Sequence, residues 1–459
     1  MPQPFPIVNP ATGQVIREHP AIDADEAARR VDTAHAAWKH WRGLPFSDRS
    51  EVLTTVAALL RAGVDRYAEC ITEEMGKPIS ESRAEVEKCA WVCEYYAAHA
   101  ESMLADERFD IEGAEVSLVC RPIGVLYAIM PWNFPLWQVF RAAAPNLMAG
   151  NAMVLKHAPI TLGCGEDITN LFGEAGAPKG LFCDLPIHVS DSPGVIAHRH
   201  IRGVTLTGSD AAGRAVAADA GANLKKCVLE LGGSDPYVVL EDADLELAAD
   251  KCVASRMLNC GQVCIAAKRL IVVNSVYEQF RDGVLDRMAG IEMQDPTDES
   301  SRLGPMARED LRQGLHEQVQ RTIAAGSTLL MGGKIPDRDG WWYPPTVLDD
   351  VKPGEPAFDE ELFGPVACLI HARDESHAIE LAGDSDLGLA GAVFTSDRRY
   401  GLTIAADEID AGSVAVNDFV RSDPRVPFGG IKDSGFGREL GVPGIREFIN
   451  LKSIVVATP

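Results

Sequence analysis

The chain has 459 residues and a formal net charge of -24. A chain of this length is expected to form two or three domains. The negative charge disfavours nucleic acid and anionic membranes as partners, and an anionic substrate would need a local cation to bind.

The composition indicates a cytoplasmic globular protein. Apolar residues make up 46% of the chain, and no apolar run reaches the roughly 20 residues that span a bilayer. No basic region followed by an apolar core opens the sequence, so no secretion signal is expected. The cysteines number 11, which indicates reduced thiols rather than a disulfide framework. Cys252, Cys260 and Cys264 lie close together, but no histidine completes a zinc pattern, so no metal site is predicted.

The N-terminal part is predicted to be mainly helical. A strand is expected over residues 7 to 20, and a helix begins near Asp23 because apolar residues then recur at spacings of three and four. A second helix is predicted from about Ser47 through Ile71, and a third over residues 80 to 104. These helices are expected to serve packing, without a catalytic role.

Residues 120 to 230 predict a doubly wound nucleotide-binding sheet. An apolar strand over 125–130 ends abruptly at 131–135, where two prolines flank a short loop around Asn133. Helix-like and strand-like segments then alternate. Because open α/β sheets bind ligands beyond the ends of their strands, this loop is a candidate site.

A candidate phosphate-binding turn lies at residues 208–213. The dinucleotide fingerprint G-x-G-x-x-G is absent from this region, and the nearest substitute is the turn from Gly208 through Ser209 to Gly213. Helix amino termini bind phosphate without a full fingerprint, so this turn remains a candidate.

Glu230 is a candidate general base. It stands between Leu229 and Leu231, just before a Gly-Gly turn. If the carboxyl group is buried, desolvation raises its pKa toward neutrality, which suits a base. The alternative is a glutamate at the end of a strand that faces solvent.

Cys264 is a candidate nucleophile. It follows a glycine turn and is flanked by small or amide residues, with an apolar run over 270–273 beyond it. A lone cysteine is more often a buried hydrophobe, so its function depends on the other segments. Cys260, four residues earlier, could form a reversible disulfide with it, or could be a small buried thiol.

The C-terminal half predicts further alternating strands and helices, with a glycine-proline loop over 421–430. The last segment, 449–456, is a long apolar strand. An exposed strand of this kind usually finds a partner, which predicts a homodimer or homotetramer.

Several motifs in this order together resemble the aldehyde dehydrogenase superfamily over essentially the full length. The motifs are PWNFP at 131–135, LELGG at 229–233, GQVC at 261–264, ELFGP at 361–365 and PFGG at 427–430. Two further segments, 134–141 and 155–159, are more narrowly similar to bacterial succinate-semialdehyde dehydrogenases.

The resemblance implies an α/β fold with a doubly wound nucleotide-binding domain, a second α/β catalytic domain and a small β oligomerisation arm. On this basis the cofactor domain is expected at 1–103 and 123–232, the catalytic domain at 233–433, and the arm at 104–122 and 445–459.

The resemblance also implies a reaction that the residues can perform. Cys264 would form a thiohemiacetal with an aldehyde, and the Asn133 side chain and the Cys264 backbone N–H would stabilise the oxyanion. After hydride transfer to nicotinamide, Glu230 would activate the water that hydrolyses the thioester. Acylating relatives, which pass the acyl group to coenzyme A, typically lack this glutamate.

The expected cofactor is NAD or NADP. Lys156 is similar to the lysine that holds the adenosine ribose, and Glu361 to the carboxylate on the nicotinamide ribose. Pro159 replaces a glutamate that many NAD-preferring relatives carry, so no carboxylate repels a 2′-phosphate there. The other expected cofactor-binding residues are Trp132, Gly208, Ser209, Gly213, Leu231 and Phe363.

The expected substrate is succinate semialdehyde. By resemblance, Arg141 and Ser422 hold its distal carboxylate, while Trp137 and Phe428 wall the tunnel. The alternatives are an internal ion pair for Arg141, a longer or aromatic aldehyde such as glutarate semialdehyde as the substrate, and a noncatalytic thiol-sensing protein.

Overall fold

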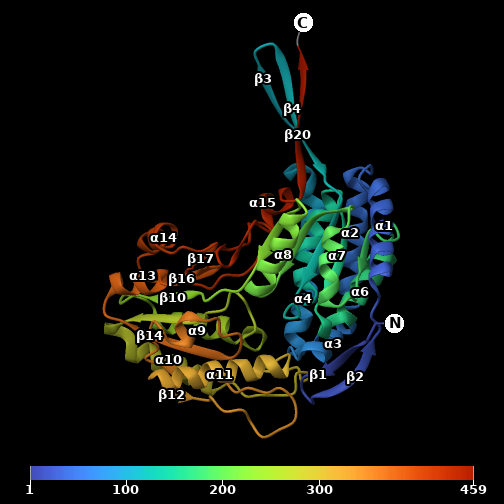
Figure 1. Ribbon diagram of the computed structural model, residues 1–459. Coiled ribbons are helices and arrows are strands. Elements are labelled where there is room, and N and C mark those ends of the chain that lie inside the picture. The colour runs from blue at the N-terminus through green and yellow to red at the C-terminus, as the bar shows by residue number, and fades with distance from the viewer. Residues whose placement is uncertain (1, 458–459) are drawn as a thin grey trace.

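The computed structural model in Figure 1 describes residues 2–457. The chain opens with an antiparallel hairpin and a run of helices. Their bounds are β1 (Phe5–Asn9), β2 (Gln14–His19), α1 (Ala24–Trp41), α2 (Phe46–Ala62), α3 (Val64–Met75) and α4 (Ile79–Met103). The second predicted helix is in fact two helices, because the first ends and the next begins at Gly63. Glycine in the interior of a helix is destabilising relative to alanine.

The first sheet has strand order β19-β9-β8-β5-β6-β7, in which β9 through β7 run parallel. Helices α1, α7 and α8 contact one another on this sheet, whereas α5 and α6 are backed by α2, α3 and α4. Two helical layers therefore enclose the strands, which is the doubly wound arrangement that the sequence predicted. The bounds are β5 (Val125–Met130), α5 (Trp137–Met148), β6 (Ala152–His157), η1 (Pro159–Thr161), α6 (Leu162–Glu174), β7 (Phe182–Asp184), η2 (Val189–Asp191), α7 (Ser192–Ala197), β8 (Ile201–Thr207), α8 (Asp210–Ala222), β9 (Lys226–Glu230) and β19 (Gly435–Phe436).

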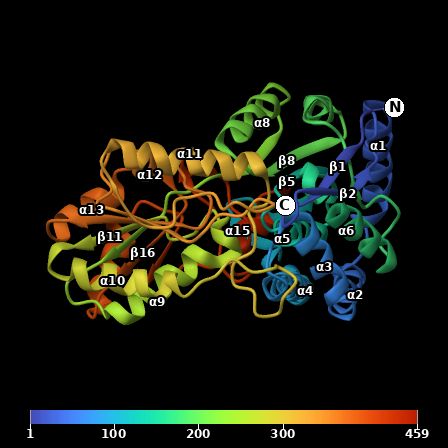
Figure 2. The same cartoon turned by 90° about the horizontal axis from the view of Figure 1, so that it is seen from below.

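The second sheet has strand order β12-β13-β14-β11-β10-β16-β17. Its strands are buried on both faces: Val238 and Ile271 enter one apolar cluster, and their neighbours Val239 and Leu270 enter another. Such two-sided burial is typical of a parallel sheet covered by helices. Figure 2 shows the two sheets side by side, with α1 at one end of the molecule and α13 at the other.

The elements of the C-terminal half have the following bounds. They are β10 (Pro236–Val239), α9 (Leu245–Met257), η3 (Leu258–Gly261), β11 (Arg269–Val273), η4 (Asn274–Val276), α10 (Tyr277–Ala289), α11 (Glu309–Ala325), β12 (Thr328–Met331), β13 (Thr346–Asp349), α12 (Pro356–Asp359), β14 (Val366–Ala372), α13 (Glu375–Gly383), β15 (Leu387–Gly388), β16 (Ala390–Phe394), α14 (Arg398–Asp407), β17 (Ser413–Val416), β18 (Ile431–Lys432) and α15 (Gly441–Arg446).

A three-stranded arm projects from the body at the top of Figure 1. It is formed by β3 (Glu107–Ile111), β4 (Ala114–Pro122) and β20 (Ile449–Ala457), in the order β20-β4-β3. Large apolar side chains are exposed on it: Phe109, Ile111, Leu451, Ile454, Val455 and Val456. Of the helices in the described residues, none combines the length and the apolar character that a membrane crossing requires.

The strands of the first sheet end beside one another. The pairing places Met130 of β5 next to His157 of β6, and Thr207 of β8 next to Glu230 of β9. The loops that follow these parallel strands therefore meet at one edge of the sheet, as expected for a doubly wound fold.

The segment before Cys264 has a left-handed backbone over three residues in succession. Asn259, Cys260 and Gly261 have φ angles of 51°, 56° and 76°. Such angles cost about 1–3 kcal/mol each in residues other than glycine, so the surroundings must hold them. The carboxylate of Glu81 on α4 accepts the Asn259 N–H at 2.8 Å and provides part of that support.

Gly261→Ala should disrupt this segment. An added Cβ would lie 2.2 Å from the backbone carbon of Gly364, which is too rigid to move aside. We expect the thermal midpoint to fall and activity to be lost. Gly221→Ala in α8 is the matched control, because nothing lies within 4 Å of its added Cβ, and alanine is preferred over glycine in a helix by about 0.5–1 kcal/mol. Equal midpoints for the two variants would contradict the role given to Gly261.

Candidate active site

Cys264 lies on a wall shared by two cavities. Cavity A, of about 260 Å³, and cavity B, of about 240 Å³, are both lined by Cys264 and Gln138. The four residues expected to hold a substrate line cavity A: Trp137, Arg141, Ser422 and Phe428. Cavity B is lined by Asn133 and by six of the residues expected to hold a cofactor: Trp132, Gly208, Ser209, Leu231, Glu361 and Phe363. The thiol is thus accessible from both sides.

Some expected residues lie outside both linings. They are Lys156, Pro159, Gly213 and Glu230. Gly213 has a packing reason for being glycine, because an added Cβ would lie 2.6 Å from the Leu231 side chain. Lys156 is buried at the carboxyl end of β6, where desolvation lowers the pKa of its ammonium group while Asp184 opposes that change.

Hydrogen bonds tie the Asn133 loop to the Cys264 segment. The Asn133 side-chain amide donates to the carbonyl of Gln262 at 3.0 Å, and the Asn259 amide donates to the carbonyl of Asn133 at 2.7 Å. Asn133 is buried, and its amide nitrogen carries a second hydrogen. Asn133 and Cys264 both line cavity B, so the amide and the cysteine segment border the same space.

The Cys264 thiol is neutral at rest. Burial raises its pKa to about 11, while the nearby cations Lys268 and Arg141 act in the opposite direction. Lys268 also donates to the Cys264 carbonyl and forms an ion pair with Glu361 at 2.8 Å. Since the thiolate is the nucleophile, a base must remove the proton before or during attack.

Glu230 is buried at the end of β9. Within the described residues, neither of its carboxyl oxygens has a hydrogen-bond partner. Burial raises its pKa well above the ordinary value, Arg141 lowers it and Glu439 raises it further. A Cβ added to Gly429 would lie 2.7 Å from its Oε1, so the carboxyl group rests against that glycine. In this position burial favours the protonated form of the group, and Glu230 lines neither cavity A nor cavity B.

Arg141 has an internal partner as well as a place in cavity A. Its Nε forms an ion pair with Glu439, and its Nη2 donates to the Thr207 hydroxyl at 3.3 Å. Its guanidinium lies 4.5 Å from the centre of the Phe428 ring. The internal ion pair that was the alternative for Arg141 is therefore present, and it leaves the guanidinium at the cavity wall.

Helix α4 contributes residues that the sequence did not indicate. Lys88 lines cavity A, and Glu85 accepts the backbone N–H groups of Leu136 and Trp137 at 2.8 and 2.9 Å. Glu85 also forms a buried ion pair with Lys77. The expectation that this helix serves packing, without a catalytic role, stays a prediction, although the helix also borders cavity A. No periodicity or motif distinguishes these side chains from a solvated helical face.

Cavity B has the features of a dinucleotide site. The amino terminus of α8 opens onto it at Ser209, whose side chain caps the helix by accepting the Ala212 N–H at 3.4 Å. Helix amino termini bind phosphate. Glu361 supplies a carboxylate held by the Gly233 N–H at 3.2 Å, and Phe363 and Trp132 form aromatic walls with ring centres 5.8 Å apart. These groups match the diphosphate, ribose hydroxyls and flat ring of a nicotinamide dinucleotide.

Cys260 is separated from Cys264 by its surroundings. Its thiol is free, fully buried and part of an apolar cluster on the second sheet, and burial raises its pKa. This placement agrees with the alternative interpretation of Cys260 as a small buried thiol. It stays a prediction that no disulfide forms with Cys264.

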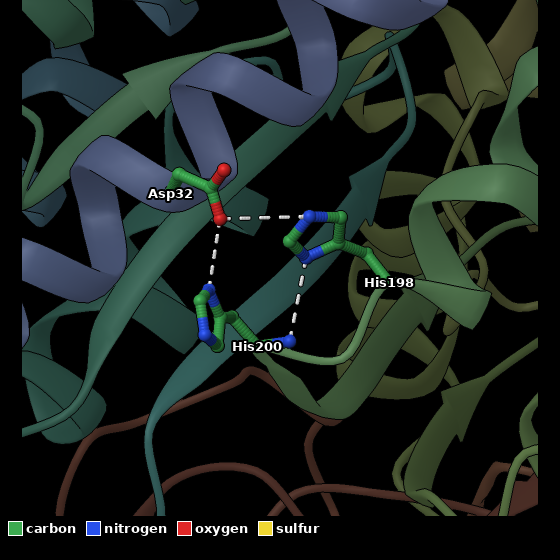
Figure 3. A group of neighbouring side chains, drawn as sticks. All are labelled: Asp32, His198 and His200. Atoms are coloured by element: carbon green, nitrogen blue, oxygen red, sulfur yellow. Dashed lines mark hydrogen bonds and ion pairs between the residues drawn. The ribbon is translucent and has the colours of Figure 1, made fainter.

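A separate cluster of possible metal ligands lies at the surface (Figure 3). Asp32 of α1 contacts His200 Nδ1 at 2.9 Å and His198 Nε2 at 3.6 Å. The His198 Nδ1 accepts the His200 backbone N–H at 3.3 Å, so its Nε2 carries the proton and faces the carboxylate. A protonated nitrogen does not bind a metal, and these residues line neither cavity A nor cavity B.

Comparisons with known proteins identify the family of the chain. The model of the aldehyde dehydrogenase family matches residues 2–454. The chain is 46% identical over 447 residues to the succinate semialdehyde dehydrogenase [NAD(P)+] Sad of Escherichia coli K12, covering 97% of this chain and 96% of that protein. It is 44% identical over 450 residues to a probable succinate-semialdehyde dehydrogenase [NADP(+)] of Synechocystis, covering 98% and 99%.

A solved structure is similar as well. The succinic semialdehyde dehydrogenase of Streptococcus pyogenes, solved in complex with NADP+, superimposes with a TM-score of 0.96 at 35% identity. The match covers 99% of this chain and 100% of that one. The cysteine between two cavities, the fold and the full-length family match lead to one conclusion: the chain belongs to the aldehyde dehydrogenase family.

Proposed function

We propose that this enzyme oxidises succinate semialdehyde to succinate with NAD or NADP. The observation that carries the proposal is Cys264 on the wall between a cavity lined by cations and a cavity with the features of a dinucleotide site. The printed names of the relatives, succinate semialdehyde dehydrogenases that use NAD(P)+ or NADP(+), support it. A panel of aldehydes assayed with both cofactors tests it, and a preference for a neutral aldehyde would contradict it.

In the first half of the reaction, the Cys264 sulfur forms a bond to the aldehyde carbon, the carbonyl oxygen takes the electron pair of the C=O bond, and the thiol proton passes to solvent water. The Asn133 amide and the Cys264 backbone N–H donate to the oxygen that gains charge, and one such donor contributes about 2.7–4 kcal/mol. A nicotinamide dinucleotide, when bound, accepts the hydride that leaves this carbon. The Asn133 and Cys264 segments are already hydrogen-bonded to each other, so the donors need little rearrangement.

In the second half, the thioester on Cys264 is hydrolysed. The Glu230 carboxylate takes a proton from water, whose oxygen adds to the acyl carbon, and the Cys264 sulfur leaves with a proton as the acid is released. Because Glu230 rests against Gly429 outside both cavities, it must rotate toward the sulfur to act.

The chain accepts either NAD or NADP because the residue three positions after Lys156 is Pro159, which carries no carboxylate. A glutamate there would bind ribose hydroxyls and repel a 2′-phosphate, and a proline does neither. Lys156, buried at the end of β6, is the cation available for the ribose or its phosphate.

The cytoplasm is the proposed location. The cysteines of the described residues are free thiols, and several of them are buried. Free thiols persist in a reducing compartment.

Glu230→Gln should separate the two halves of the reaction. The variant keeps the shape of the side chain and removes the base, so rapid mixing should show a burst of NAD(P)H and then a steady-state rate lower by roughly a hundredfold or more. Glu241→Gln, at an exposed glutamate, is the control. Loss of the burst itself would assign Glu230 to the first half instead.

Replacing the Arg141–Glu439 pair should weaken binding of the distal carboxylate. A hydrogen bond to a charged group contributes about 1.5–3 kcal/mol, so the KM for succinate semialdehyde should rise roughly tenfold to a hundredfold. Steady-state kinetics with butanal should be unaffected.

The double variant Arg141→Met, Glu439→Gln is needed for this measurement. Arg141→Met alone leaves the buried Glu439 without a counter-ion, which costs about 3–5 kcal/mol of stability. Equal losses with succinate semialdehyde and butanal would refute the role of Arg141.

The projecting arm is proposed to join copies of this chain. Strands β20 and β3 form its two edges, and apolar side chains are exposed along both. Edges and apolar surfaces of this kind are normally covered by a partner.

Val455→Lys should therefore reduce the size of the assembly. Val455, on β20, is 62% exposed, and a charge placed there would be buried without a partner if the arm forms an interface. Light scattering coupled to size-exclusion chromatography measures the mass. Val189→Lys, at an apolar residue 71% exposed on the body, is the control. A wild-type monomer would exclude the interface.

A further inference from the structure

The cations of cavity A differ in whether they have a counter-ion. Arg141 is paired with Glu439, and Arg421 is paired with Asp418 at 3.0 Å. Lys88 also lines the cavity, and among residues 2–457 no carboxylate lies within 4.0 Å of its ammonium group. The positive charge that cavity A offers to an anion is therefore mainly that of Lys88.

The partners of Lys88 hold it at the cavity wall without neutralising it. Its ammonium nitrogen donates to the Ser422 hydroxyl at 2.9 Å and lies 4.1 Å from the centre of the Trp137 ring. Both partners line the same cavity. A cation over an indole face is attracted to it, but the ring carries no net charge. Lys88 keeps two further N–H groups for a ligand.

Ser422 is set to donate to the same ligand. Its oxygen accepts from Lys88 and, at 3.0 Å, from the indole N–H of Trp137. A hydroxyl accepts two hydrogen bonds and donates one, so these two donors leave the Ser422 O–H for a third group. The buried hydroxyl and the adjacent ammonium thus present donors to one point in the cavity.

We propose that Lys88 and Ser422 together form the seat of the substrate's distal carboxylate, with Lys88 as its counter-ion and Arg141 as a second donor. This inference rests on the proposed oxidation of a semialdehyde. It makes Lys88, on the N-terminal helix α4, the residue that distinguishes a carboxylate-bearing aldehyde from a neutral one. The chain as a whole carries a net charge of -24, so a local cation of this kind is needed to bind an anion.

The charge of Lys88 depends on pH near neutrality. Burial and then Arg141 lower the pKa of its ammonium group, Cys89, Glu85 and Asp423 oppose them, and the resulting pKa is about 8. Other charged groups around these neighbours are held in pairs: Lys77 with Glu85, Arg421 with Asp418, and Arg425 with Asp423. The cation is present below this pKa and lost above it, so the KM for succinate semialdehyde should rise as the pH increases past 8.

Lys88→Met in the full-length enzyme tests the proposal. The KM for succinate semialdehyde should rise roughly tenfold to a hundredfold, and the KM for butanal should change much less, so that the ratio of the two KM values shifts by about tenfold or more. The rise of KM above pH 8 should vanish in the variant. Lys88→Arg keeps the charge and should recover much of the affinity. Lys39→Met, at an exposed lysine of α1, is the matched control for loss of one positive charge.

A second variant, Ser422→Ala, tests the proposal independently if Lys88→Met does not fold. Ser422→Ala keeps Lys88 and should raise the KM for succinate semialdehyde but not for butanal, while the thermal midpoint shows that the protein is folded. Unchanged selectivity in a folded Lys88→Met would overturn the proposal. A wild-type enzyme with no preference for succinate semialdehyde over butanal would instead overturn the proposed function, so the two failures are distinguishable.

Discussion

The position of the reactive thiol depends on a left-handed turn that hydrogen bonds hold in place. Asn259 and Cys260 have backbone angles that are unfavourable for residues with a side chain. The Asn259 amide donates to the carbonyls of Asn133 and Gln262, and its backbone N–H is accepted by Glu81. The same contacts join the cysteine segment to the Asn133 loop, so the proposed nucleophile and the proposed oxyanion donor are fixed relative to each other.

Two buried carboxyl groups interact with one arginine. Arg141 forms an ion pair with Glu439 and lowers the pKa of Glu230. Glu439 takes the ion pair, and Glu230, with no hydrogen-bond partner in the part of the chain that the structure describes, is driven toward its neutral form. Two carboxylates cannot both be stabilised by one cation in a poorly hydrated site. The assignment of charges thus separates a structural carboxylate from a potential base.

Much of this site could be predicted from the sequence, because its groups stand on loops at strand ends. The motifs around Asn133, Glu230 and Cys264 are short and local. The predicted sheet places Asn133 and Glu230 at one edge, whereas Cys264 comes from the segment between η3 and β11 of the second sheet. Lys88 and Glu81 could not be predicted in this way. They lie among charged residues on a long helix, where the usual expectation is a solvated face, and only the packing of α4 against α5 turns them inward.

The role of Glu439 could not be predicted from the sequence for a related reason. It forms an isolated bridge with Phe428 and reaches Arg141 from almost three hundred positions away in the chain, a contact that no spacing rule reports. The ion pair with Glu439 changes what Arg141 can do. A guanidinium with a counter-ion keeps its N–H donors but loses most of its electrostatic attraction for an anion. A motif identifies the residue type at a site, whereas its net charge is set by the fold.

The resting position of Glu230 connects its protonation to its location. Against Gly429 the carboxyl group is buried, and burial raises its pKa and so favours the protonated form, which is not a base. Rotation toward the cavities brings it nearer to water, where its ionised form is favoured. As the proposed base, Glu230 would therefore gain basicity in the same movement that brings it toward the Cys264 sulfur, so its burial and its proposed role are connected through one side-chain rotation.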